Sequence, residues 1–196
     1  MNPLKPIAVM IFRVKVTLSG IKGFYRVYKA GGDTTLYTLH KQMRADMEFP
    51  QDQLIMFKAM DPLGDVVARY GLFDLGSGAV DEVTIAKAVN DGAVSFVYFY
   101  DVTNRKSVNI SVEEDGEGLS STYPVIVDSK GPNPIEFENG YVAFEDLPDH
   151  QRHLPGEGIP GLDDDEDFDD EDLEDEDEEE EDGDEDGKEI YDENEE

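Results

Sequence analysis

The feature that constrains this chain most is the uneven distribution of its charge. Of the 34 residues from 163 to 196, 26 are Asp or Glu and only Lys188 is basic. The first 162 residues carry 22 acidic and 15 basic side chains, so they account for only −7 of the formal net charge of −32. A segment with so few apolar groups cannot offset an ordering cost of about 1–2 kcal/mol per residue. We therefore predict a folded N-terminal part and a disordered, polyacidic C-terminal tail.

Composition also sets the predicted domain limits and the compartment. Residues 147–161 contain three prolines and three glycines, which is typical of a linker. We predict a globular domain at residues 1–146, a linker at 147–162 and the acidic tail at 163–196. The chain has no Cys, which excludes disulfides, zinc-thiolate and iron–sulfur sites and thiol nucleophiles. Neither a membrane-spanning apolar stretch nor a signal peptide is evident, so we expect a soluble, cytoplasmic protein.

Hydrophobic periodicity in the first half of the domain indicates a β-hairpin, a helix and a strand. Residues 11–18 alternate apolar and polar side chains, and residues 24–29 form the returning strand. The next segment has an N-cap signal at 33–35, a helical apolar stripe and a closing Pro50. That stripe consists of Leu36, Leu39, Met43 and Met47. A third strand is predicted at 54–60, followed by loops at Gly64 and 71–78.

The second half predicts a short helix and further strands. The helix covers residues 84–89. Residues 93–100 are almost continuously apolar, as in a central strand covered on both faces. Residues 106–113 alternate strictly and form a hairpin with that strand around Thr103–Arg105. Further strands are predicted at 123–127 and, more weakly, at 141–144. The fold class is α+β: an α/β roll with one mixed sheet, opened by a β-hairpin–helix–strand unit and packed against helices.

Four motifs give the chain a family resemblance. They are GIK..FYR at 20–26, DTTLYTLH at 33–40, FPQDQLIMF at 49–57 and FVYFYDV at 96–102. With these motifs the chain resembles the Ri-plasmid Orf-three-like family, often labelled transposon passenger TnpR-like proteins, over roughly residues 10–145. The chain looks like a divergent branch of that family, because Thr103, Asn104 and Lys106 stand where the family's hairpin has Gly, Asp and Trp. The resemblance implies an α/β roll of unsettled function.

The opening order of elements also looks like a β-grasp. Hairpin, helix and then a strand introduced by Pro50, Asp52 and Gln53 follow the ubiquitin-type order. We use this likeness for the fold and not for function, since one fold hosts many functions.

Six residues are candidates for partner binding: Tyr25, Arg26, His40, Phe49, Tyr100 and Asp101. His40 and Phe49 match the motifs of the family resemblance. Tyr25 and Tyr100 belong to an aromatic set, together with Tyr98 and Phe99, that has two interpretations. One is packing in the core and on the sheet. The other is an aromatic groove with Arg26 and Asp101 at its rim, which would take a peptide or small ligand. His40 is either functional, as the family match suggests, or a partly buried histidine bonded to the backbone.

Other motifs give no cofactor, metal or catalytic site. Residues 182–193 formally match a calcium loop, but such a match arises easily in an acidic segment, and no helix can form on either side. His150 and His153 lie between prolines in the predicted linker and lack a third ligand. Neither a catalytic triad nor a phosphate loop can be argued. We expect a protein that is not an enzyme.

The tail suggests a non-catalytic interaction module. Its acidic residues could engage basic protein surfaces or compete for their nucleic-acid sites, while their charge disfavours direct binding to nucleic acid or membrane. The tail is represented by Asp163, Asp164, Asp165, Glu166, Asp167, Asp169, Asp170, Glu178, Glu179, Glu180 and Glu181. The alternatives are a tail that only confers solubility, and a small-ligand or peptide binder, or an enzyme of unknown reaction, that uses the aromatic face. The sequence does not indicate an oligomeric state.

Overall fold

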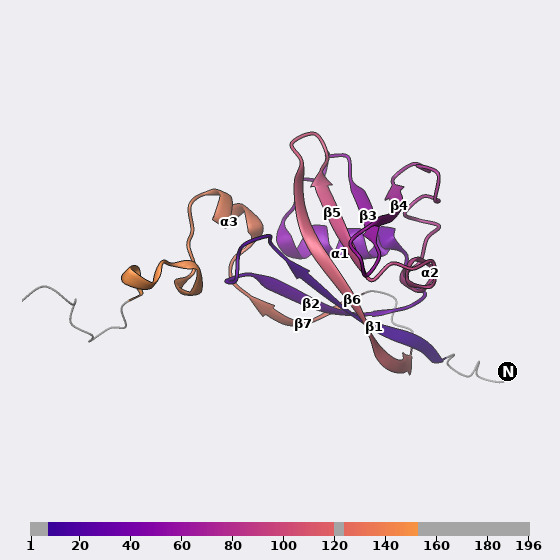
Figure 1. Cartoon of the computed structure of the whole chain (residues 1–196). Coiled ribbons are helices and arrows are strands. Elements are labelled where there is room, and N and C mark those ends of the chain that lie inside the picture. Colours follow the sequence, from indigo (N-terminus) through magenta and orange to yellow (C-terminus); the bar gives the residue numbers. More distant parts are fainter. Residues whose placement is uncertain (1–7, 120–123, 153–196) are drawn as a thin grey trace, which may run out of the picture. The chain divides into compact units, whose positions relative to one another are not determined.

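The described part of the chain forms one seven-stranded sheet with short helices. The computed structural model describes residues 8–119 and 124–152 (Figure 1). The strands are β1 (Ala8–Thr17), β2 (Tyr25–Gly31), β3 (Met56–Met60), β4 (Val66–Gly71), β5 (Ser95–Asp101), β6 (Lys106–Leu119) and β7 (Val125–Lys130). Their order in the sheet is β4-β3-β5-β6-β1-β2-β7, and every pairing is antiparallel. The predicted α+β class, with a hairpin, a helix and then a strand at its start, is confirmed. Two strands, β5 and β6, separate β3 from β1.

The first turns of two helices are connected by backbone pairing. Helix α1 (Leu36–Met47) begins where the Thr35 hydroxyl accepts a bond from the Thr38 amide, and α2 (Ile85–Asn90) is capped in the same way by Thr84. Thr35 and Thr84 also form an isolated β-bridge, which joins the two caps. Helix α1 ends at Glu48, whose φ of 56° is left-handed and whose amide donates to the Arg44 carbonyl. These backbone contacts therefore fix the first turns of the two helices relative to each other.

The core lies between these helices and one face of the sheet, the covered face. All four apolar residues of the predicted helical stripe are buried. They meet alternate residues of the strands, including Phe12, Val14 and Val16 of β1 and Phe96 and Tyr98 of β5. The intervening residues, such as Arg13, Lys15 and Asn109, are exposed. We call this second side the open face.

The strand at 93–100 is not covered on both faces, so that expectation was wrong. In β5, Phe96, Tyr98 and Tyr100 are buried, whereas Ser95, Val97 and Phe99 are only half-buried. Its apolar open-face residues made the segment look continuously hydrophobic. Burial alternates along the strand with a period of two, but the residue types do not, because apolar residues occur on both faces.

The sequence also misassigned the segments with few buried residues. Strand β4 was not predicted, because its first residues, Val66 and Val67, are exposed at the sheet edge and show no alternation. Residues 141–144 are not a strand. Instead a short helix, α3 (Pro134–Glu138), begins with proline at its first turn, and 3₁₀ turns follow at Phe144–Asp146 and Asp149–Gln151. Most of the predicted linker and the whole acidic tail lie outside the described residues.

Candidate functional site: a groove on the open face

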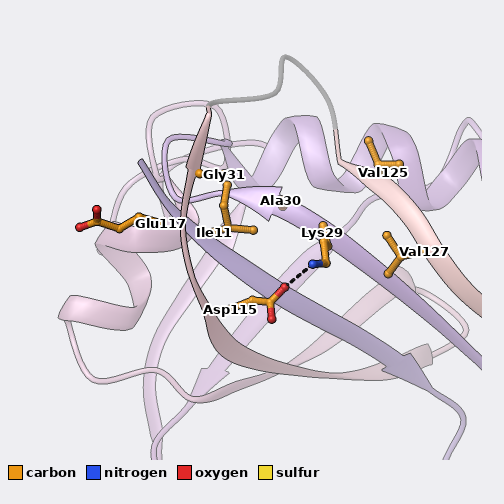
Figure 2. A pocket seen from close by; sticks show the side chains of 9 residues that line it. Ile11, Lys29, Ala30, Gly31, Asp115, Glu117, Val125 and Val127 are labelled. Atoms are coloured by element: carbon orange, nitrogen blue, oxygen red, sulfur yellow. Dashed lines mark ion pairs between the residues drawn. The ribbon is translucent and has the colours of Figure 1, made fainter. Parts of the chain in front are cut away.

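A groove of about 400 Å³ lies on the open face of the sheet (Figure 2). Its floor includes Ile11 of β1 and Gly31 of β2. Asp115 of β6 lines one wall, and Val125 and Val127 of β7 line the other. Glu117 also borders the groove, but its side chain points away from Lys29 and Asp115 (Figure 2). The groove therefore brings together four strands, with a carboxylate on one side and aliphatic side chains on the other.

Irregular strand pairing shapes the groove. The register of β1 with β6 shifts between Met10 and Phe12, and that of β2 with β7 shifts between Val27 and Tyr28. Such bulges bend a strand and increase its twist. Gly118 allows β6 to approach the floor closely, because a Cβ there would lie 2.8 Å from Cγ1 of Ile11.

One ion pair crosses the groove. Lys29 of β2 contacts Oδ2 of Asp115 on β6 at 2.6 Å, over the intervening strand β1 (Figure 2). The hydrogen bond and charge of Lys29 lower the pKa of Asp115 from its usual range, and Arg13 adds to this effect. Both side chains are partly exposed, so the pair contributes little to stability. The ion pair does, however, fix the position of the Asp115 carboxylate beside the apolar side chains of the groove.

The open face carries charges of both signs along its strands. In the ladder, Arg13 of β1 lies opposite Lys29 on one side and Glu113 on the other. Lys15 is 5.3 Å from the centre of the Tyr25 ring, and the Tyr25 hydroxyl donates to Asp128 at 3.3 Å. Tyr25, one of the predicted partner-binding residues, therefore lies on this face and remains half-buried.

Arg26 has a structural role at the covered side of β2. It is only 7% exposed, and its guanidinium donates to the carbonyls of Tyr25, Lys130 and Gly131 and to Oδ1 of Asn133. Burial lowers the pKa of Arg26 from its usual value. These bonds connect β2 to the end of β7 and to the segment that leads into α3.

His40 lies inside the domain. Its Nδ1 is 2.6 Å from the hydroxyl of Tyr98 on β5, and its side chain is a buried residue of α1. Burial lowers the pKa of His40 to about 4, and the positive charges of Arg44 and Lys41 act in the same direction. Burial also raises the pKa of Tyr98. His40 is therefore neutral at neutral pH and bonded to a neutral phenol.

Tyr100 and Asp101 lie at the C-terminal end of β5, and Phe49 packs on Tyr100. The rings of Phe49 and Tyr100 stack with centroids 3.9 Å apart, and the Tyr100 hydroxyl donates to Glu138 of α3. Asp101 accepts bonds from the Asn104 backbone and side chain, which closes the β5–β6 turn and lowers the pKa of Asp101. These three predicted site residues thus have identifiable packing and turn-forming roles.

The structure does not bring the aromatic set around a common hollow. Tyr98 and Tyr100 face the core, whereas Phe99 lies on the open face, 5.5 Å from the ammonium of Lys58. Tyr25 is on β2, which β1 and β6 separate from β5. This arrangement agrees with the first interpretation, packing in the core and on the sheet.

Sequence reasoning missed the groove residues. The acidic run from Glu113 to Glu117 was visible in the sequence, as was the aliphatic run of β7. No local pattern placed Lys29 beside Asp115, because the order of β6, β1, β2 and β7 in the sheet decides that contact. In residues 8–119 and 124–152, no group of three or more His, Asp or Glu side chains could hold a metal ion. No helix within these ranges is long and apolar enough to cross a membrane.

The fold and groove define a class: a small antiparallel α+β domain with one face covered by helices and one face open. The family model described as plasmid pRiA4b ORF-3-like protein matches residues 10–177. The chain belongs to this family, as its motifs predicted. The crystal structure of a protein of unknown function from Methanosarcina mazei Go1 is similar at 16% sequence identity and a TM-score of 0.48. That similarity covers 67% of this chain and 79% of the other. No functionally curated protein shows significant similarity to the chain.

Proposed function

We propose that this protein is a non-catalytic, cytoplasmic interaction module whose acidic C-terminal segment engages basic proteins or competes for their nucleic-acid sites. The charge density of residues 163–196 carries the proposal. Thirty-four residues span at most about 110 Å when fully extended. Their 26 acidic groups then give one charge per about 4 Å, close to the phosphate spacing of about 3.4 Å along one nucleic-acid strand.

The partner in this proposal is a basic protein surface. A polyanion of this density releases counterions from a cationic surface, so its binding weakens steeply as salt rises. The same charge repels nucleic acid and anionic membranes, and we exclude them as direct partners. His40 and Asp101 are residue types that often act in catalysis. In the domain, His40 is bonded to Tyr98 in the core, and Asp101 accepts a hydrogen bond from Asn104 in the β5–β6 turn. These contacts support a binding role over a catalytic one.

Capture of basic proteins tests the proposal. The full chain is compared with a variant in which every Asp and Glu from 163 to 196 is replaced by Asn or Gln. The replacement keeps the length of the chain and the size of each side chain but removes the negative charge. Each is immobilised and exposed to histone-like and ribosomal basic proteins at 50 and 500 mM salt. We expect capture by the full chain at low salt, loss at high salt and little capture by the amide variant. Equal capture by both chains would contradict the proposal.

A second candidate function is a peptide or small-ligand binder in which the tail only confers solubility. The observation that favours it is the groove of about 400 Å³, since ligand pockets occupy about 300–1,000 Å³. The aromatic face on which this candidate first rested is divided between core and surface. The groove would therefore be its site. Binding that is independent of the tail and insensitive to salt distinguishes this function from the first.

A further inference from the structure

We propose that the chain forms a two-fold symmetric dimer through an apolar patch at the end of edge strand β4, in which Phe73 of each copy enters a hollow on the other copy. The inference goes beyond the proposed function, because it concerns the folded domain and not the acidic segment. The occupant of the hollow is therefore a second copy of this chain. The exposed residues of the patch are Leu54, Val66, Val67, Leu72, Phe73 and Leu75.

A hollow of about 290 Å³ lies within the patch. Of the eight residues that line it, seven have apolar side chains and the eighth is Gly71. The lining comes from three places in the sheet: Leu54 and Ile55 precede β3, Leu72 follows β4, and Val102 follows β5. An apolar cavity of about 150 Å³ can bind benzene, so this hollow has room for a phenylalanine ring. Since none of the lining residues is charged, charge does not select the occupant.

The loop after β4 holds apolar side chains in water. Phe73 is 75% exposed and Leu75 is 53% exposed. Between them, Asp74 accepts hydrogen bonds from the amides of Gly76 and Gly78 at 2.7 and 2.8 Å. Both glycines have positive φ, at 104° and 102°, which glycine adopts readily. The loop therefore has a bonded conformation, and presenting the ring in advance lowers the ordering cost of association.

The exposed apolar area is close to what a stable dimer needs. The six residues of the patch have exposed fractions between 38% and 75%, which corresponds to roughly 500 Å² of apolar surface, and patches of about 300–600 Å² are often functional. A standard interface buries about 800 Å² on each partner, of which about 56–65% is non-polar. The apolar part of such an interface is thus about 450–520 Å² per partner. One patch on each copy is sufficient.

The patch is complementary to itself. Phe73 and the hollow that it borders belong to the same surface, and a two-fold axis places each feature of one copy against the other feature of its partner. An aromatic side chain in an apolar pocket is typical of the residues that dominate binding energy. Strand β4 has β3 as its only neighbour in the sheet, so Val66 and Val67 lie at an edge that a second copy can reach.

The charge of the chain opposes this dimer and gives it a distinctive salt dependence. Each chain carries a formal net charge of −32, so two copies repel each other, and salt screens that repulsion. The dimer should therefore become tighter as salt rises. Capture of basic proteins by the acidic segment should change in the opposite direction, because salt weakens attraction between opposite charges.

Sedimentation equilibrium of the full chain, from about 10 to 500 μM at 50 and 500 mM salt, tests the proposal. Phe73→Ser removes the ring. Its matched control is Leu63→Ser, since Leu63 is 86% exposed but does not line the hollow. Leu54→Asp places a charge at the hollow, and Val125→Asp places the same charge on a similarly exposed residue of β7, at the opposite edge of the sheet. Circular dichroism confirms that all four variants remain folded.

We expect a dimer with a dissociation constant below about 100 μM at 500 mM salt. Phe73→Ser and Leu54→Asp should each weaken it at least about tenfold, and each control less than about twofold. In a mixture of isotope-labelled and unlabelled chains, filtered NOE spectra should connect the Phe73 ring of one copy with methyl groups of Leu54 and Val102 of the other. The inference is overturned if the members of each pair behave alike or if these intermolecular contacts are absent. A chain that stays monomeric up to 500 μM at 500 mM salt also overturns it and leaves the hollow to an apolar segment of a different protein.

The variant with Asn and Gln in place of the acidic residues of 163–196 separates this inference from the proposed function. Loss of the tail charge should tighten the dimer at 50 mM salt and abolish capture of basic proteins. A monomeric full chain that captures basic proteins only through its acidic segment would reject the dimer alone. A dimer whose capture of basic proteins is the same with and without the tail charge would reject the proposed function alone.

Discussion

The two faces of the sheet differ in what their side chains are available to do. On the covered face, His40 is bonded to Tyr98, Phe49 is stacked on Tyr100, and these groups are at most 5% exposed. On the open face, Lys29, Asp115 and the valines of β7 remain accessible. Most residues predicted for partner binding thus make packing or hydrogen-bond contacts within the fold, while the groove is built from residues for which the sequence predicted no function.

This difference has a physical cause. Burial removes water from a polar group under a helix, so such a group usually bonds within the fold, as His40 bonds to Tyr98. A polar group on the open face keeps its water and can exchange it for a ligand. Mutations on the covered face should therefore change stability, and those on the open face should change binding. The following tests measure that contrast.

The largest effect is expected from a core aromatic. Phe57 is fully buried and packs against Phe96 and Tyr98, so Phe57→Ala should lower the free energy of unfolding by about 3–5 kcal/mol through lost burial and a cavity. Met56→Ala, one residue away on the open face, should cost less than half as much. Urea denaturation followed by circular dichroism measures both. Equal losses would show that the open face is packed as tightly as the covered one.

A smaller loss is expected at Arg26. Lysine cannot reproduce the fork that serves three carbonyls and Asn133, so Arg26→Lys should cost about 2–3 kcal/mol by leaving buried acceptors unpaired. Arg13→Lys on the exposed part of β1 should change stability by less than about 0.5 kcal/mol. The same denaturation experiment measures the pair. An unaffected Arg26→Lys variant would show that these bonds are not needed to hold the segment before α3.

The pH dependence of stability reports on His40. Its folded pKa is about 4, below the unfolded value of about 6.5, so protons bind the unfolded chain more tightly. The resulting stability is fully present above about pH 6.5 and is lost as pH falls toward 4; at pH 5 the loss is about 2 kcal/mol. His40→Gln should remove most of this dependence between pH 7 and 5. A wild-type unfolding free energy that stays constant over this range would contradict the assignment.

The smallest effect on stability is expected at the groove's ion pair. Lys29→Gln removes the group that lowers the pKa of Asp115, so that pKa should rise toward its ordinary value while the denaturation midpoint stays unchanged within error. Carbon-detected NMR titration of the Asp115 carboxyl follows the first quantity. Arg13 should keep part of the shift, since its charge also acts on Asp115. A large drop in the midpoint would assign the ion pair to the fold.

Periodic segments were predicted well because their own residues determine their structure. The alternation of β1 and the stripe and cap of α1 agree with the observed burial and hydrogen bonds. Strand β4 and helix α3 were missed because their structure depends on neighbours: β4 forms by pairing with β3, and α3 is positioned by contacts such as Phe137 with Phe24. Short elements with few buried residues have a weak pattern of their own.

The candidate functional residues also separate into those that the sequence indicated and those that only the structure revealed. Sequence selected Arg26, His40, Phe49, Tyr100 and Asp101 because their types are chemically versatile, and the structure gives each a defined packing or hydrogen-bond role. Lys29, Asp115 and Val127 carried no signal, since a lysine, an aspartate and a valine on separate strands have no fixed spacing along the chain.

By itself, the amino-acid sequence determined the family, the α+β class, the main strands with helix α1, and the segregation of charge, since each depends on residue types and on spacing within one segment. Only the tertiary structure decided which face of the sheet is open, which polar groups are buried, and that β6 and β7 enclose a groove. These features arise from the order of strands in the sheet. That order is fixed by contacts between residues far apart in the chain, whose free energies no local pattern encodes.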